Sequence, residues 1–123
     1  MEQQFQDVTD MLSLYFDGLY HSDTDRLRQV FHPQSSYICA TDEPMVHLTM
    51  DDYFPIVDQR EAPADRNEER RDRIVSIQFA GPSTAFAVVN CAIGPKYFTD
   101  FLTLVLTGGR WQIISKVFHY DII

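Results

Sequence analysis

Two polar residues late in the chain, Asp100 and His119, carry side chains that can hold or transfer a proton. They lie in two apolar segments that flank Gly108-Gly109, a pattern that predicts a β-hairpin. If these glycines form a two-residue turn, Thr107 faces Arg110, and Asp100 and His119 become diagonal neighbours on the apolar face. Such a pair is either an ion pair at the rim of the core or the polar end of an internal pocket.

The same register assigns every other residue of the hairpin to one of two faces. The apolar face is predicted to be the core side and contains Phe98, Asp100, Leu102, Leu104, Leu106, Trp111, Ile113, Ser115, Val117 and His119. The opposite face is mixed and contains Thr99, Phe101, Thr103, Val105, Thr107, Arg110, Gln112, Ile114, Lys116 and Phe118. A turn of three or four residues would change this assignment.

The elements that must position this hairpin are predicted from apolar spacing and from helix signals. An amphipathic helix is expected from Gln4 to His21, with Tyr15, Phe16 and Leu19 among its apolar residues. A second helix should begin at Ser22 or Asp23 and end at Pro33, and a third should follow a cap at Thr49. Strands are expected over residues 35–41, 74–80, 84–93, 98–107 and 110–120. Helices followed by strands in series predict an α+β fold with an antiparallel sheet.

Composition bounds the function. The 123 residues fit one domain, 1–123, and a formal net charge of −8 argues against nucleic acids and anionic membranes as partners. We see no signal peptide, no membrane span and only two cysteines, which predicts a cytoplasmic protein with reduced thiols. The spacing of His and Cys residues matches no metal site, and no glycine-rich phosphate loop occurs, so we expect no metal and no cofactor. The polar stretch 61–73 is predicted to be a solvated connection rather than a lid.

Four segments together resemble the nuclear transport factor 2-like superfamily, and most closely its branch described as putative lumazine-binding. These segments are Tyr15 to Asp23, Phe31-His32-Pro33, Phe98 to Leu104, and Gly109 to His119. The resemblance spans roughly residues 5 to 120. It implies a cone-shaped α+β barrel, in which three N-terminal helices pack on a strongly curved, mostly antiparallel sheet around a pocket. It also implies a homodimer formed through the open sheet face.

Within this superfamily, the resemblance to ketosteroid isomerases places Tyr15 and Asp100 at the positions of the tyrosine and the protonated aspartic acid that stabilise an oxyanion. Cys39 falls where those enzymes have a carboxylate base. A cysteine with an ordinary pKa is a poor base at neutral pH. The chain therefore resembles the anion-stabilising half of such a site, and His119 is the remaining candidate acid or base.

The function predicted from these observations is binding of a small molecule, planar or carbonyl-bearing, in an apolar and aromatic pocket. The predicted ligand contacts are Tyr15, Phe16, Leu19, Cys39, Phe54, Asp100, Leu102, Trp111 and His119. Two alternatives stay open. One is a cofactor-free isomerase, dehydratase or cyclase that uses Tyr15, Asp100 and His119. The other is a non-catalytic dimeric accessory module, since fold alone does not choose function.

Overall fold

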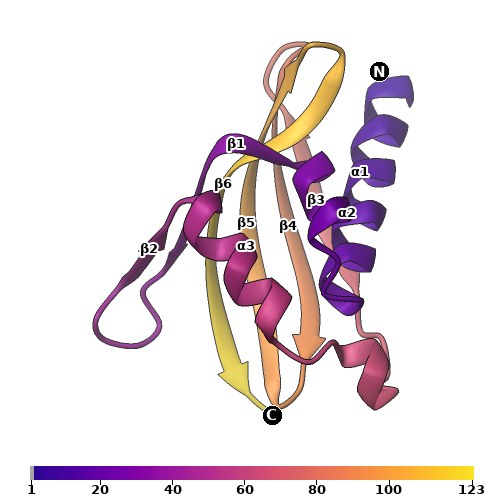
Figure 1. The fold of residues 1–123 in the computed structure, drawn as a ribbon. Coiled ribbons are helices and arrows are strands. Elements are labelled where there is room, and N and C mark those ends of the chain that lie inside the picture. The colour runs from indigo at the N-terminus through magenta and orange to yellow at the C-terminus, as the bar shows by residue number, and fades with distance from the viewer. Residues whose placement is uncertain (1) are drawn as a thin grey trace.

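The fold, described here for residues 2–123 of a computed structural model, has three α-helices packed on one curled sheet (Figure 1). The elements in chain order are α1 (Glu2–Tyr20), α2 (Thr24–Val30), β1 (Phe31–Cys39), β2 (Val46–Leu48), α3 (Met50–Gln59), the 3₁₀ turn η1 (Pro63–Arg66), β3 (Arg73–Phe79), β4 (Thr84–Ile93), β5 (Lys96–Thr107) and β6 (Arg110–Ile122). The predicted α+β class is confirmed.

The six strands are ordered β2-β1-β6-β5-β4-β3. β1 runs parallel to β6, and every other neighbouring pair is antiparallel. Because β2 and β3 form two separate edges, the sheet is curled rather than closed into the predicted barrel. The short strand β2 was not predicted, and its three residues give too brief a pattern to recognise.

Helix starts follow the local cap signals. The side chain of Asp23 accepts hydrogen bonds from the backbone N–H groups of Asp25 and Arg26, which caps α2. Thr49 caps α3 through the N–H of Asp52. The predicted end of the second helix was wrong, because the chain leaves the helix at Val30 and Pro33 lies within β1. The β1 strand therefore begins four residues before the predicted start.

The core lies between the helices and the concave face of the sheet. Tyr15 and Tyr53, from α1 and α3, are among the largest fully buried side chains. Phe31, at the start of β1, contacts both rings edge-on at 5.9 Å. Aromatic residues from three elements thus fill the centre, and burial of apolar surface of this kind favours folding.

The β5–β6 hairpin starts in the predicted register and then leaves it. Thr107 pairs with Arg110, and Leu104 pairs with Ile113, but Thr103 pairs with Ser115, which leaves Ile114 as an extra residue. This β-bulge reverses the faces of every β6 residue that follows it. The predicted faces are therefore wrong beyond the bulge.

Burial after the bulge follows the shifted register. Lys116 and Phe118 point into the core and are 4% and 8% exposed, whereas Val117 is 41% exposed. His119 is also on the exposed side. The predicted neighbour of Asp100, an imidazole, is thus replaced by an ammonium group.

The polar connection 61–73 is mostly exposed, as predicted, but it is anchored. Glu68 accepts a hydrogen bond from the backbone N–H of Gly94 at 2.9 Å, and its carbonyl accepts one from the hydroxyl of Tyr20. Arg70 pairs with Asp17 of α1 at 2.9 Å. Within residues 2–123, no helix has the length and apolarity needed to cross a membrane.

Candidate functional site

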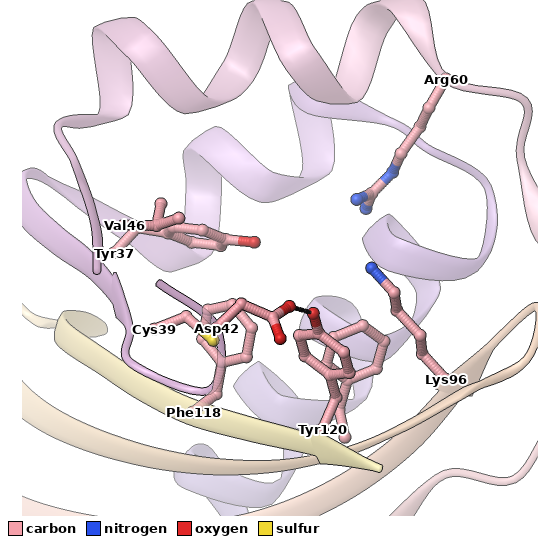
Figure 2. Close-up of a pocket in the computed structure, with 9 residues that line it drawn as sticks. Tyr37, Cys39, Asp42, Val46, Arg60, Lys96, Phe118 and Tyr120 are labelled. Atoms are coloured by element: carbon pink, nitrogen blue, oxygen red, sulfur yellow. Dashed lines mark hydrogen bonds between the residues drawn. The ribbon is translucent and has the colours of Figure 1, made fainter. Parts of the chain in front are cut away.

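A pocket of about 240 Å³ opens at one end of the curled sheet (Figure 2). Its walls come from β1, β2, the end of α3, and the ends of β5 and β6 that lie far from the Gly108-Gly109 turn. The lining residues are Tyr37, Cys39, Asp42, Val46, Arg60, Lys96, Phe98, Phe118 and Tyr120. The curl of the sheet brings these distant segments around one hollow.

Beneath the pocket, three buried polar side chains form a connected cluster. The Tyr15 hydroxyl donates a hydrogen bond to Asp100 Oδ2 at 2.6 Å, and Lys116 Nζ lies 3.9 Å from the same oxygen. The other oxygen, Asp100 Oδ1, is buried and has no hydrogen-bond partner. A buried carboxylate is normally paired and fully hydrogen-bonded, so this half-satisfied group marks a polar site inside an apolar core.

Lys116 is enclosed by aromatic rings. Its Nζ lies 5.0–5.2 Å from the ring centroids of Tyr15, Tyr37 and Phe118, within cation–π range. Burial is the largest single influence on the pKa of Lys116 and lowers it, but the Asp100 carboxyl together with smaller contributions from Tyr53, Tyr37 and Cys91 outweighs burial, so the pKa lies above the ordinary lysine range. The ammonium form is therefore held at the base of the pocket.

A small inner cavity of about 10 Å³ lies between this cluster and the pocket. The inner cavity and the pocket share three lining residues, Tyr37, Arg60 and Phe98. Lys116 and Cys91 also line the inner cavity, whose volume is near the lower limit for one water molecule. Burial, with a smaller contribution from Asp100, raises the pKa of Cys91 to about 12, so its thiol is not a base at neutral pH.

Arg60 follows the last turn of α3 and extends its guanidinium toward the centre of the pocket (Figure 2). Two of its nitrogens, Nε and Nη2, are buried and have no hydrogen-bond partner. Among residues 2–123, no carboxylate oxygen lies within the 4.0 Å that defines an ion pair with this side chain. An unpaired guanidinium is the strongest unsatisfied donor in the pocket.

The mouth of the pocket contains a second cation and a paired acid. The Tyr120 hydroxyl donates a hydrogen bond to Asp42, and Lys96 Nζ lies 4.4 Å from the Tyr120 ring centroid. The hydrogen bond to Asp42 raises the pKa of Tyr120. The carboxylate of Asp42 is therefore already engaged, whereas both cations face the hollow (Figure 2).

Apart from His119, each predicted contact residue lines a cavity, lies in the polar cluster or belongs to the core. Cys39 lines the pocket and Leu19 lines the inner cavity, while Tyr15 and Asp100 meet in the cluster below them. The others are core residues that line neither space: Phe16, Phe54, Leu102 and Trp111. Trp111 lies seven residues along β6 from Phe118, roughly 20 Å of strand away from the pocket.

The predicted meeting of His119 with Asp100 is wrong, because the bulge turns His119 outward. Its ring nitrogens contact Thr41 at 2.8 Å and Asp121 at 2.9 Å, both at the surface. An imidazole in this position cannot exchange a proton with a ligand in the pocket.

The resemblance to ketosteroid isomerases placed Tyr15 and Asp100 at one site, and the structure brings the two side chains together. The Tyr15 hydroxyl donates a hydrogen bond to Asp100, a contact that the resemblance did not imply. In those enzymes both groups donate hydrogen bonds to a ligand, whereas here the Tyr15 hydroxyl donates to Asp100 itself, and Lys116 Nζ lies 3.9 Å from the same carboxyl oxygen. The arrangement therefore differs from the implied one by the lysine beside the acid.

Sequence reasoning missed Arg60 and Tyr37 and placed Lys116 and Phe118 on the wrong face. Lys116 could have been noticed in the sequence, because it lies among apolar residues of a predicted strand. A lysine that is buried in such a strand needs a carboxylate partner. No comparable signal distinguishes Arg60, which follows a helix like many solvent-exposed arginines.

Comparison with known proteins identifies the family of the chain and shows which solved structures share its fold. The family model described as putative lumazine-binding matches residues 3–119. A curated protein named aldolase FrzH, from Cladobotryum sp, is 25% identical over 107 residues, which cover 85% of this chain and 82% of that protein.

Solved structures share the fold across nearly the whole chain. An NTF2-like protein of unknown function from Shewanella baltica OS155 superposes with a TM-score of 0.86 at 24% identity, covering 98% of this chain and 96% of that one. The association domain of C. elegans CaMKII superposes with a TM-score of 0.67 at 11% identity, covering 95% of each chain.

Proposed function

The chain belongs to the family described as putative lumazine-binding, and from this premise we propose that it binds a small organic molecule in the pocket at the open end of the sheet. The observation that carries the proposal is a 240 Å³ hollow with aromatic walls, an unpaired guanidinium on one side and a buried charged cluster below. Convergent polar groups in an apolar hollow are the usual form of a small-molecule site.

The pocket's size and walls narrow the ligand. Sites for drug-sized molecules span about 300–1,000 Å³, so a 240 Å³ pocket suits a smaller metabolite. Phe98, Phe118 and Tyr37 supply ring surfaces, which favour a planar ligand. The Arg60 guanidinium and the Tyr37 hydroxyl can donate hydrogen bonds to a carbonyl oxygen.

Cys39 offers a direct test, because a large side chain there would fill the hollow without removing a charge. Lumazine and a panel of planar carbonyl compounds would be screened by native mass spectrometry against wild type, C39F and C39S. Binding to wild type and C39S, with loss in C39F, supports the proposal. If ligands bind C39F as well as wild type, the pocket is not the site.

A second candidate function is catalysis on a carbonyl compound, favoured by the likeness to a protein named as an aldolase. In this reading, the ammonium of Lys116 and the guanidinium of Arg60 stabilise the negative charge that develops on a carbonyl oxygen. Tyr15 and Asp100 act as positioning residues, because they line neither the pocket nor the inner cavity.

Turnover assays would separate catalysis from binding. Loss of one charge-stabilising donor costs about 10²–10³-fold in rate, so K116M should lower turnover by that factor while binding in the outer pocket persists. Equal turnover by K116M and wild type would remove the catalytic candidate.

We also propose that two copies associate through the convex face of the sheet. Phe101 of β5 is 50% exposed there, and its ring lies 5.7 Å from that of Phe86 on β4. Val117 is 41% exposed on β6 beside them. Exposed apolar side chains on neighbouring strands fit a surface that is covered by a partner. The CaMKII association domain offers a fold-level parallel.

A reducing compartment suits this chain. Cys39 and Cys91 are both free and buried. We therefore propose a cytoplasmic location, which fractionation of cells expressing the tagged protein would test.

A further inference from the structure

We propose that the ligand of the pocket is an organic carboxylate and that the guanidinium of Arg60 is its anchor. This inference rests on the proposed binding function and specifies the chemical class of the ligand. The inference starts from hydrogen-bond donors that have no acceptor within the described residues.

The two unpartnered nitrogens of Arg60 form one edge of the guanidinium. Nε and Nη2 project parallel N–H bonds from that edge, and this spacing matches the two oxygens of a carboxylate. A neutral carbonyl group has a single oxygen and cannot pair with both N–H groups in this parallel arrangement. The geometry of the donor therefore favours a planar anion.

The surroundings of Arg60 leave its charge without compensation. The charged groups that line the same two spaces are the ammonium groups of Lys96 and Lys116 and one carboxylate, Asp42. Asp42 accepts the hydrogen bond from Tyr120 and forms no ion pair with Arg60. Arg60 is only partly buried, but its two enclosed nitrogens lack both a hydrogen-bond partner and a counter-charge, and unsatisfied donors of this kind are costly unless a ligand engages them. The Nε–Nη2 edge is enclosed in the structure, so the proposal requires a change in the Arg60 rotamer that exposes this edge to the ligand.

The charge of the pocket contrasts with that of the whole molecule. The chain has a formal net charge of −8, yet the pocket lining contains two cations, Arg60 and Lys96, and one anion, Asp42. Asp42 accepts the hydrogen bond from Tyr120 and lies at the mouth (Figure 2). A cationic hollow in an acidic protein discriminates in favour of anionic ligands at short range.

The rest of the ligand is constrained by the walls opposite Arg60. Phe98 and Phe118 contact each other at a centroid distance of 5.8 Å and present ring surfaces to the hollow. An aromatic carboxylate would place its ring against them and its charged group at Arg60. Benzoate is therefore the simplest probe, and benzamide is its neutral counterpart.

NMR titration would measure the interaction at the proposed atom. The Arg60 Nε–Hε resonance, assigned by its loss in R60Q, is followed while benzoate, benzamide or phenyl phosphate is added to the intact protein. R110Q is the matched control, because Arg110 is an exposed arginine in the hairpin turn, away from the pocket. Thermal unfolding of each variant confirms that it is folded.

The expected result is a benzoate-dependent shift of the Arg60 resonance, with benzamide about 10- to 100-fold weaker. R60Q should lose the same factor for benzoate, while R110Q binds as wild type. If benzoate and benzamide bind equally and R60Q retains both, the pocket binds small molecules but the carboxylate assignment is wrong. Stronger binding of phenyl phosphate than of benzoate also overturns it. If neither compound perturbs any pocket resonance, both this inference and the proposed binding function fail.

Discussion

The buried ion pair between Lys116 and Asp100 allows a quantitative prediction about stability. Lys116→Met removes the ammonium but keeps an unbranched side chain of similar length among the same aromatic rings. Asp100 would then retain only the hydrogen bond from Tyr15 on Oδ2, with Oδ1 still unpartnered. Breaking a buried pair on one side costs about 3–5 kcal/mol, because a charge is left buried without its partner.

This cost can be expressed as a melting temperature. Unfolding entropy near 60 °C is about 2.1 cal/mol/K per residue, or about 0.26 kcal/mol/K for 123 residues. A loss of 3–5 kcal/mol therefore lowers Tm by about 12–19 °C. Such a loss is a large share of the 5–15 kcal/mol that stabilises a typical domain.

The double variant K116M/D100N separates the charge effect from packing. With both charges removed, no uncompensated carboxylate remains, and the double variant should be less destabilised than K116M alone. Urea unfolding followed by fluorescence of Trp111, the one tryptophan, would give the free energies. The reasoning is refuted if K116M costs less than about 1 kcal/mol or if the two substitutions simply add.

Four further outcomes follow from the structure. Cys91 should lower the free energy of unfolding between pH 9 and 12 by up to about 1.4 kcal/mol per pH unit, because its pKa is raised to about 12 in the fold and its thiol ionises earlier when unfolded. The raised pKa values of Tyr15, Tyr37 and Lys116 act in the same direction. C91A should therefore reduce the slope of the urea-derived pH profile without abolishing it, and an unchanged slope would contradict this. In native protein at pH 8, iodoacetamide should label Cys39 before Cys91, as judged by peptide mass spectrometry; faster labelling of Cys91 would show that its burial is wrong. F101D should convert a dimer into a monomer of 14.3 kDa by light scattering, while a wild-type monomer at micromolar concentration would exclude the proposed interface. Tyr15→Phe should cost about 1.5–3 kcal/mol in urea unfolding, since Asp100 loses a charge-assisted hydrogen bond, and no change would mean that this bond contributes nothing.

Local signals predicted the parts of the fold that depend on local contacts. Asp23 and Thr49 cap their helices because a side-chain oxygen two or three residues before a free N–H is enough to start a helix. The Gly108-Gly109 turn was also predicted from local sequence, because two-residue hairpin turns require positive φ angles, which glycine adopts readily. Both glycines have positive φ angles in the structure. These choices are made within a few residues of the chain.

The site was harder to predict because it depends on contacts that are remote in sequence. The bulge at Ile114 inserts one extra residue into β6. The alternation of apolar and polar residues along the strand does not reveal at which residue such an insertion occurs. Asp100 was placed in the core correctly, because it precedes the bulge on the partner strand and its face is unaffected. Arg60 faces the pocket only because α3 packs across β1, a contact that local patterning does not encode.

The excess of acidic residues has a consequence for the speed of ligand capture. Beyond about 10 Å in 0.1 M salt, charges are largely screened, but in dilute buffer a molecule of net charge −8 repels an approaching anion. Added electrolyte should therefore accelerate the encounter with a carboxylate even as it weakens the bond at Arg60. Stopped-flow measurements across ionic strengths would show opposite trends for association rate and affinity, whereas most electrostatically steered complexes lose both together.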